Sequence, residues 1–93
     1  MEIQKIKGSD GFNEKYKDYL TEGHYGMSFD DEQVIDYLDG VFQEFIKREG
    51  FEYQQIKLKF GMARFYADMI STDEMIAVES RINELLKDKV DKW

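Results

Sequence analysis

Cysteine and proline are both absent from this 93-residue chain, and histidine occurs once. Without cysteine the chain has no disulfide, no thiolate nucleophile and none of the cysteine-based zinc sites. No apolar run approaches the roughly 20 residues that span a bilayer, and the N-terminus lacks the continuous apolar segment of a signal peptide. These absences predict a cytoplasmic protein that contacts no membrane and holds no cofactor.

Basic side chains are also in short supply. The chain holds 13 of them against 20 acidic ones, and its net charge is −7. The acidic excess is concentrated in residues 30–50, where 7 side chains are acidic and 2 are basic. Such a chain is not expected to bind nucleic acid directly by charge attraction, whereas a basic protein surface would suit it as a partner. Acidity also has a plain role, since it keeps a small protein soluble.

The hydrophobic pattern predicts one α+β domain over residues 1–93. Apolar residues recur at helical spacing over about residues 12–21, 31–49 and 72–90, and residues 53–68 alternate with a period of two, as a β-hairpin does. A hairpin is marginal alone in water. We therefore expect a small antiparallel sheet covered on one face by helices, with residues 1–7 as a weaker candidate for another strand.

Capping residues predict where two of these helices begin. Asp30 is the expected N-cap of the second helix, with Gln33 in the reciprocal position, and Gly50 is its expected stop. Ser71 and Glu74 are expected to form a capping box at the start of the last helix.

The hairpin prediction depends on Gly61. A type II′ turn at Gly61-Met62 would pair Leu58 with Phe65, Lys59 with Arg64 and Lys57 with Tyr66. This register places on one face the apolar side chains Ile56, Leu58, Phe60 and Phe65, with Gln54. It places on the other face a set that we call the basic face: Lys57, Lys59, Arg64 and Tyr66. One long strand with a bulge at Gly61 is the alternative.

Few residues are candidates for chemistry. His24 lies in a glycine-flanked loop near Ser28, but a nucleophile relay also needs a carboxylate beside them, and a lone loop histidine is usually solvated. The aspartates and glutamate near the start of the second helix lack the alternating loop ligands of an EF-hand. We therefore predict no catalytic residue, no metal site and a role other than catalysis.

Two charged surfaces remain as candidate binding sites. The first, which we call the acidic face, is predicted to bind a protein partner through Asp31, Glu32, Asp36, Asp39 and Glu44. The alternative is the basic face, as a site for an anion or a nucleotide. Each also has a plain interpretation: a solvated helix surface for the first, and pairing with the chain's own carboxylates or plain solvation for the second.

Residues 55–66, QIKLKFGMARFY, resemble a segment of a family of small uncharacterised proteins, many of them encoded by bacteriophages. The matching positions are Gln55, Lys57, Lys59, Phe60, Gly61, Arg64, Phe65 and Tyr66, whereas Met62 and Ala63 replace the family's usual Gly-Leu. The order helix–hairpin–helix extends the resemblance to about two thirds of the chain. The family's C-terminal Cys-x-x-Cys is absent here, so no metal or redox role carries over. The resemblance implies a phage or prophage origin without a mechanism.

These features together predict a small acidic phage-type accessory protein that binds and inhibits a host protein in the host cytoplasm, such as an anti-CRISPR or other anti-defence factor. The acidic face would imitate nucleic-acid phosphates against a basic nucleic-acid-binding host protein. An anion- or nucleotide-binding module and an immunity protein against a toxin nuclease are the alternatives. A homo-oligomer is also open, with Phe51 or Trp93 either in the core or in an exposed association patch.

Overall fold

A computed structural model describes residues 8–90, with side chains described for residues 8–87. The elements follow in the order α1 (Gly8–Lys15), a short 3₁₀ helix η1 (Lys17–Tyr19), β1 (Gly26–Met27), α2 (Glu32–Phe45), β2 (Glu52–Lys59), β3 (Met62–Asp68) and α3 (Thr72–Val90). The predicted α+β class, the hairpin and the presence of three helices are confirmed. The first helix begins four residues before the predicted residue 12 and ends at Lys15, with η1 after it, and the parallel strand β1 was not predicted. The candidate strand over residues 1–7 and the environment of Trp93 lie outside the described residues.

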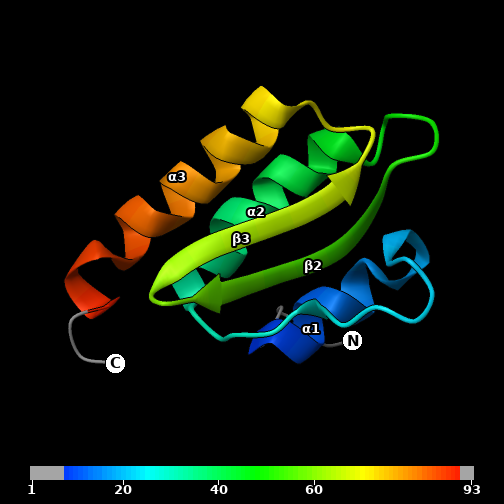
Figure 1. Cartoon of the computed structure of the whole chain (residues 1–93). Helices are drawn as coiled ribbons and strands as arrows, with labels where there is room; N and C mark the ends of the chain where they lie inside the picture. Colours follow the sequence, from blue (N-terminus) through cyan, green and yellow to red (C-terminus); the bar gives the residue numbers. More distant parts are fainter. Residues whose placement is uncertain (1–7, 91–93) are drawn as a thin grey trace.

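The strands form one mixed sheet in the order β1-β2-β3. The hairpin strands β2 and β3 are antiparallel, and β1 lies parallel to β2 on its other side. Figure 1 shows α2 behind the sheet and α3 along its β3 side. No helix of residues 8–90 crosses the front of the sheet in this view. The front face is therefore the surface that the hairpin presents outward.

An aromatic cluster holds α1, α2 and β2 together behind the sheet. The ring of Phe42 in α2 meets the rings of Phe12, Tyr16, Phe51 and Tyr53 edge-on, with centroids 5.0 to 5.4 Å apart. Edge-to-face pairs add about 0.5–1.5 kcal/mol each beyond the area that they bury. Phe51 is only 3% exposed, so it belongs to the core and is not part of an association patch.

The hairpin turn lies one residue earlier than predicted. Lys59 pairs with Met62, which leaves Phe60 and Gly61 as the two turn residues, with φ angles of 53° and 75°. Positive φ at both positions is the type I′ combination, whose twist matches that of the flanking strands. Phe60 was expected on the apolar face and is instead 94% exposed at the turn. That part of the prediction was wrong.

The register moves by two residues as a consequence. Arg64 pairs with Lys57 rather than Lys59, and Phe65 pairs with Ile56 rather than Leu58. A shift of one residue would exchange the two faces of a strand, but a shift of two restores them. The predicted separation of an apolar side from a cationic side therefore holds although the predicted pairs were wrong.

A β-bulge interrupts β2 near its start. Tyr53 pairs with Ala67 and Gln55 pairs with Tyr66, so Gln54 is an extra residue without a partner in β3. The extra residue lets Tyr53 share the buried face with Ile56, and it places Gln54 beside Gln55 on the outer side. The expectation that Gln54 lies with the apolar side chains was wrong, because alternation stops at the bulge.

A side chain of α1 covers the β1 edge of the sheet. The amide of Asn13 donates to the carbonyl oxygen of Met27 and accepts from its N–H, both at 2.9 Å. The Asn13 oxygen also accepts from the hydroxyl of Tyr53 at 3.1 Å. A Cβ on Gly26 would lie 2.4 Å from that oxygen, and Gly26 has a φ of +70°, so this close approach requires glycine.

Side chains of α3 cover the β3 edge in the same way. The N–H of Ala63 donates to Asn83 Oδ1 at 2.7 Å, and the N–H of Phe65 donates to Glu79 Oε2 at 2.9 Å. Asn83 and Glu79 are four residues apart and so lie on one face of the helix. Open strand edges invite pairing with other chains, and these two side chains occupy two of the outward N–H groups of β3, those of Ala63 and Phe65.

The helix α2 begins and ends inside its predicted limits. Asp31, not Asp30, is its N-cap, because the Asp31 carboxylate accepts the N–H of Val34 at 3.0 Å. Asp30 accepts the N–H of Ser9 instead and caps the start of α1. Two consecutive aspartates gave no local signal of which one a distant helix would engage. The helix ends at Phe45, and turns follow as far as Gly50.

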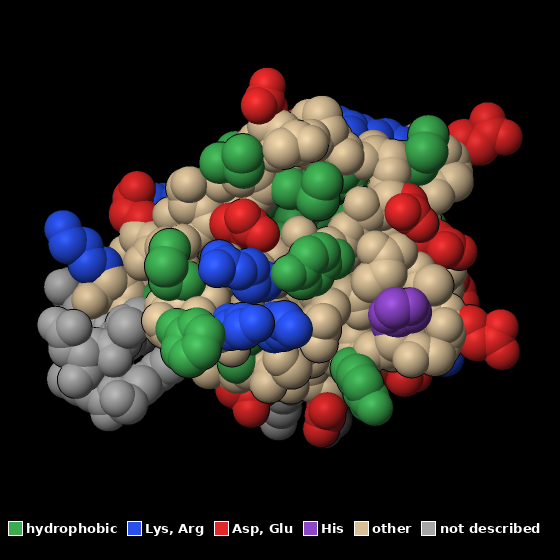
Figure 2. Space-filling view, viewed as in Figure 1, with side chains coloured by type: hydrophobic (Ala, Val, Ile, Leu, Met, Phe, Trp, Pro, Cys, Tyr) green, Lys and Arg blue, Asp and Glu red, His purple; other side chains and the backbone are tan. Residues whose placement is uncertain are grey.

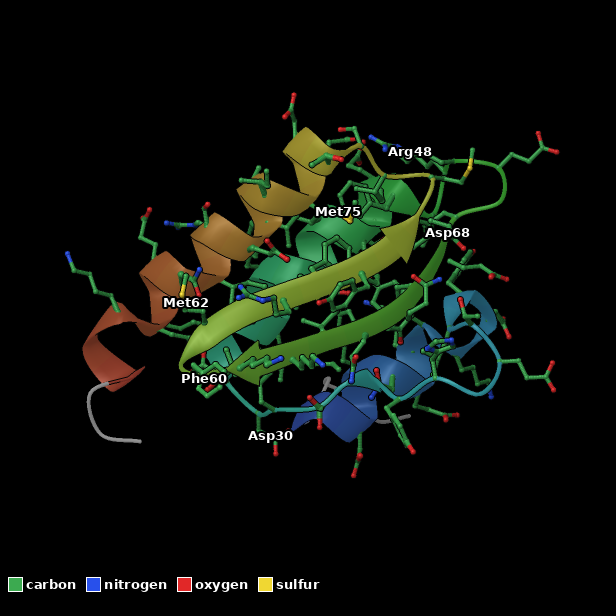
Figure 3. The ribbon with its side chains drawn as sticks, viewed as in Figure 1. Asp30, Arg48, Phe60, Met62, Asp68 and Met75 are labelled. Carbon is green, nitrogen blue, oxygen red and sulfur yellow. The ribbon has the colours of Figure 1, made fainter. Side chains whose placement is uncertain are left out.

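The predicted capping box of α3 is confirmed. The N–H of Ser71 donates to Glu74 Oε1 at 3.0 Å, and the N–H of Glu74 donates to Ser71 Oγ at 3.1 Å. The Glu74 carboxylate also accepts hydrogen bonds from Nη1 and Nη2 of Arg48. Arg48 Nη1 donates as well to the carbonyl oxygen of Met69 at 3.0 Å. This arginine, labelled in Figure 3, ties the segment after α2 to the start of α3.

Candidate functional site

Two of the five acidic-face residues serve the fold. Asp31 caps α2. The Asp39 carboxylate accepts Lys15 Nζ at 2.7 Å and also the hydroxyl of Tyr16, and Gln43 Nε2 donates to that hydroxyl at 2.9 Å. The predicted acidic face is therefore not one continuous free surface.

The surroundings of Asp39 change two pKa values. Burial raises the pKa of Asp39, but hydrogen bonds from Lys15 and Tyr16 outweigh it, so the pKa lies below its ordinary value. Burial, followed by the hydrogen bond to Asp39, raises the pKa of Tyr16. Asp39 is thus held as a carboxylate and Tyr16 as a neutral phenol, which is the arrangement that the hydrogen bond requires.

The other three acidic residues, Glu32, Asp36 and Glu44, are exposed. They follow one ridge of α2 at four-residue spacing, with Gly40 at the remaining position. Glu44 lies 3.1 Å from Lys47 one turn further on, an exposed pair of small energetic value. Among the described residues, a Cβ on Gly40 would meet nothing within 4 Å. The part of the acidic face that the fold does not use is therefore this ridge with a glycine notch, in which Glu44 has an exposed ion pair with Lys47.

Cross-strand pairing gathers the basic face. Lys57 lies directly opposite Arg64, and Lys59 follows on the same side of β2. None of the ion pairs formed among residues 8–87 involves these three side chains. Like charges directly opposite each other on a sheet are destabilising. No described carboxylate therefore lies within ion-pair distance of the basic face, although Figure 2 shows an acidic side chain beside the central cations. The pairing interpretation does not apply to residues 8–87, whereas plain solvation of these cations remains open.

A shallow open pocket of about 350 Å³ includes Lys57 of this cationic pair in its lining. Its lining combines one loop and two strands: His24, Gln54, Gln55, Lys57 and Tyr66. Tyr66 lies opposite Gln55 and remains 46% exposed. Figure 2 shows the Lys and Arg side chains together near the middle of this surface, with the single histidine to one side and exposed hydrophobic side chains around them.

Charge is distributed unevenly along the hairpin. Its open end, where Glu52 pairs with Asp68, is acidic. Gln54 Nε2 donates there to Thr21 Oγ1 at 2.8 Å and to Asp68 Oδ2 at 3.2 Å, which fixes the glutamine at the pocket rim. Figure 3 shows Asp68 and Phe60 at opposite ends of the hairpin. The cationic region is thus bounded by carboxylates at one end.

Exposed apolar side chains border the basic face at its other end. Phe60 is 94% exposed and Met62 50%, and Lys59 Nζ lies 5.9 Å from the centroid of the Phe60 ring. The sequence predicted the cations and Tyr66 but missed His24, Gln54 and Gln55 as pocket residues. The bulge and the two-residue strand β1 create their proximity, and neither produces a periodic pattern.

Neither a metal site nor a spanning helix is found where the structure describes the chain. No three or more His, Cys, Asp or Glu side chains there are grouped to hold a metal ion, and no helix within residues 8–90 has both the length and the apolarity to cross a bilayer. No family model matches the chain, and neither the curated proteins nor the solved structures give a significant match. The resemblance to the phage family stays a prediction.

Proposed function

We propose that the protein acts by binding, without catalysis, and that the basic face is its recognition surface for an anionic ligand. The observation that carries this proposal is the opposed pair Lys57 and Arg64, which has no carboxylate partner in the described chain and adjoins an open pocket. An anion bound at this pair would relieve the repulsion between the two cations. The acidic remainder of the chain offers no second cationic surface of this kind among residues 8–87.

The test is a thermal-shift measurement with small anions. Inorganic phosphate, pyrophosphate and citrate at millimolar concentration and constant ionic strength should raise the unfolding temperature, because a ligand that binds only the folded state stabilises it. Lys57→Gln combined with Arg64→Gln should abolish the shift. Lys47→Gln, which removes an exposed lysine on the turn after α2, should leave it unchanged. If the double variant shows the same shift as the wild-type protein, the basic face is not the anion-binding site. If no anion shifts the unfolding temperature of the wild-type protein, the proposed anion-binding function is wrong.

A second candidate is the predicted binding and inhibition of a host protein. The ridge of Glu32, Asp36 and Glu44 around Gly40 supports it. A glycine inside an exposed helix costs about 1 kcal/mol relative to alanine, and no side chain of the described residues fills the space that a Cβ at Gly40 would take. A notch between carboxylates would admit close approach by a basic partner, such as a nucleic-acid-binding protein of the host.

Affinity capture from host lysate separates this candidate from the first. Glu32→Lys combined with Asp36→Lys should release a partner that the wild-type protein retains, while Glu49→Lys, a charge reversal beyond the helix, should keep it. A partner captured equally by all three proteins would rule out the acidic ridge as its binding site. A partner lost only with Lys57→Gln and Arg64→Gln would assign it to the basic face.

A further inference from the structure

We infer that the basic face and its pocket bind a nucleoside phosphate, with the phosphate between Lys57 and Arg64 and the base stacked on Tyr66. This inference rests on the proposed function and adds the ligand class. It combines three features of one surface: a cationic pair, an exposed ring and a pocket lined by side chains with hydrogen-bonding groups.

The cationic pair fits a phosphate better than a carboxylate. Directly opposed residues of an antiparallel pair have their Cβ atoms about 5 Å apart, so the heads of Lys57 and Arg64 can reach one anion. A phosphate monoester carries a charge of about −1.5 to −2 at neutral pH and has three acceptor oxygens. It can therefore neutralise both cations, and the planar guanidinium of Arg64 can bind two of its oxygens together.

The position of Tyr66 fits a base attached to that phosphate. Tyr66 lies two residues after Arg64 on the same face of β3, a spacing of about 7 Å along a strand. A nucleotide separates its phosphate and its base on a similar scale. The ring is half exposed and borders the pocket, and an aromatic ring is a stacking surface for any base.

The rest of the pocket can contact a base edge. Gln55 and His24 contribute side chains with hydrogen-bonding groups to the lining. Gln54 uses its amide nitrogen on Thr21 and Asp68, so its carbonyl oxygen can serve as an acceptor. The pocket volume of about 350 Å³ lies at the low end of small-molecule sites, which suits a single nucleotide.

The charge distribution favours one nucleotide over a strand. Glu52 and Asp68 close the open end of the hairpin next to the pocket, and the whole chain carries −7. A nucleic-acid strand that continued past the pocket would bring further phosphates close to these carboxylates, which would repel them. Tight binding of nucleic acid needs favourable contacts to many phosphates, and this surface offers them to one.

Isothermal titration calorimetry with the folded wild-type protein tests the inference. The ligands are nucleoside monophosphates and diphosphates of each base, the free nucleosides, inorganic phosphate and a short single-stranded oligonucleotide. We expect nucleoside phosphates to bind at least about tenfold more tightly than phosphate or nucleoside alone, because they engage both parts of the site. We expect Tyr66→Leu to weaken nucleotide binding about tenfold, the scale of base stacking, and to leave phosphate binding unchanged.

Matched variants make the result specific. Lys57→Gln and Arg64→Gln should each weaken the binding of both nucleotides and phosphate. Two control variants should leave both affinities unchanged: Lys47→Gln, and Tyr25→Leu at an exposed ring outside the pocket lining. Equal affinity for phosphate and nucleotides would overturn this inference and leave the proposed anion site standing. Tighter binding of the oligonucleotide than of any mononucleotide would also overturn it. If no phosphate-bearing ligand binds, the inference of a nucleotide site is wrong. The thermal-shift measurements with anions then test the proposed anion-binding function separately.

Discussion

The acidic face of α2 and the basic face of the hairpin differ in how many of their charges the fold uses. The acidic face has more charges, but Asp31 caps a helix and Asp39 holds Lys15 and Tyr16. The basic face has fewer charges, yet its three cations have no carboxylate partner among the described residues. A count of charged residues therefore overstates the free acidic surface and understates the basic one, because a charge is available to a ligand only when the fold does not already neutralise it.

The largest expected effect comes from removing Asp39. Asp39→Ala takes the acceptor from Lys15 and from the largely buried Tyr16 hydroxyl, and should cost about 2 kcal/mol of unfolding free energy, the scale of hydrogen bonds to charged groups. Asp36→Ala, at an exposed position of the same helix, should stay within about 0.5 kcal/mol. Urea denaturation of both variants measures the difference. Equal stability of the two variants would mean that the fold does not depend on Asp39, which would then belong to the free acidic surface.

Acid titration should separate the same two kinds of carboxylate. The hydrogen bonds from Arg48 and then those at Ser71 lower the pKa of Glu74 from 4.5 to about 2, and the pKa of Asp39 lies below its ordinary 3.8. A depressed folded-state pKa adds stability that is fully present above the ordinary pKa and is lost as pH falls through the folded value. Stability should therefore decline as pH falls from about 4.5 toward 2.

Substitution of Glu74 identifies its share of that decline. Glu74→Gln should be less stable at neutral pH and should lose less stability between pH 4.5 and 2 than the wild-type protein, as measured by urea denaturation at a series of pH values. Glu32→Gln, which removes one negative charge from an exposed position of α2, is the matched control. A Glu74→Gln profile parallel to that of the wild type would contradict a folded-state role for the Arg48–Glu74 pair.

A smaller effect of opposite sign is expected at the notch of the acidic ridge. Gly40→Ala should raise the unfolding free energy by about 1 kcal/mol, because alanine is the better helix former and its Cβ would meet no described residue within 4 Å. The same variant should weaken the binding of a partner that approaches the notch closely. A stabilised variant with unchanged partner capture would show that the glycine serves no contact on this face.

The sequence was sufficient for features set by local patterns. Alternation with a period of two separated the apolar and cationic sides of the hairpin, and that separation survives a register shift of two residues. The Ser71–Glu74 capping box was also predictable, because its two partners lie within one helical turn. The helical regions followed from their apolar stripes.

Features that depend on distant partners were not predictable. The carboxylate of Asp39 meets Lys15 from another helix, and Asp30 caps α1 although it precedes α2. The pocket depends on the bulge at Gln54 and on a parallel pairing of only two residues in β1. Single-sequence periodicity carries no information on such contacts, so it identified the charged residues but not which of them were already paired.

The smallest expected effect is a change of stability at the basic face, and it tests whether the repulsion between its cations is unrelieved in the protein without ligand. Lys57→Gln should raise stability by about 0.5 kcal/mol at low salt, because it removes a like charge directly opposite Arg64. Lys59→Gln should have less effect, since Lys59 pairs with Met62. Urea denaturation at low and high salt checks both, and the gain at Lys57 should shrink as salt screens the repulsion. A loss of stability in Lys57→Gln would mean that the fold itself uses this lysine, and the contrast between the two faces would then fail.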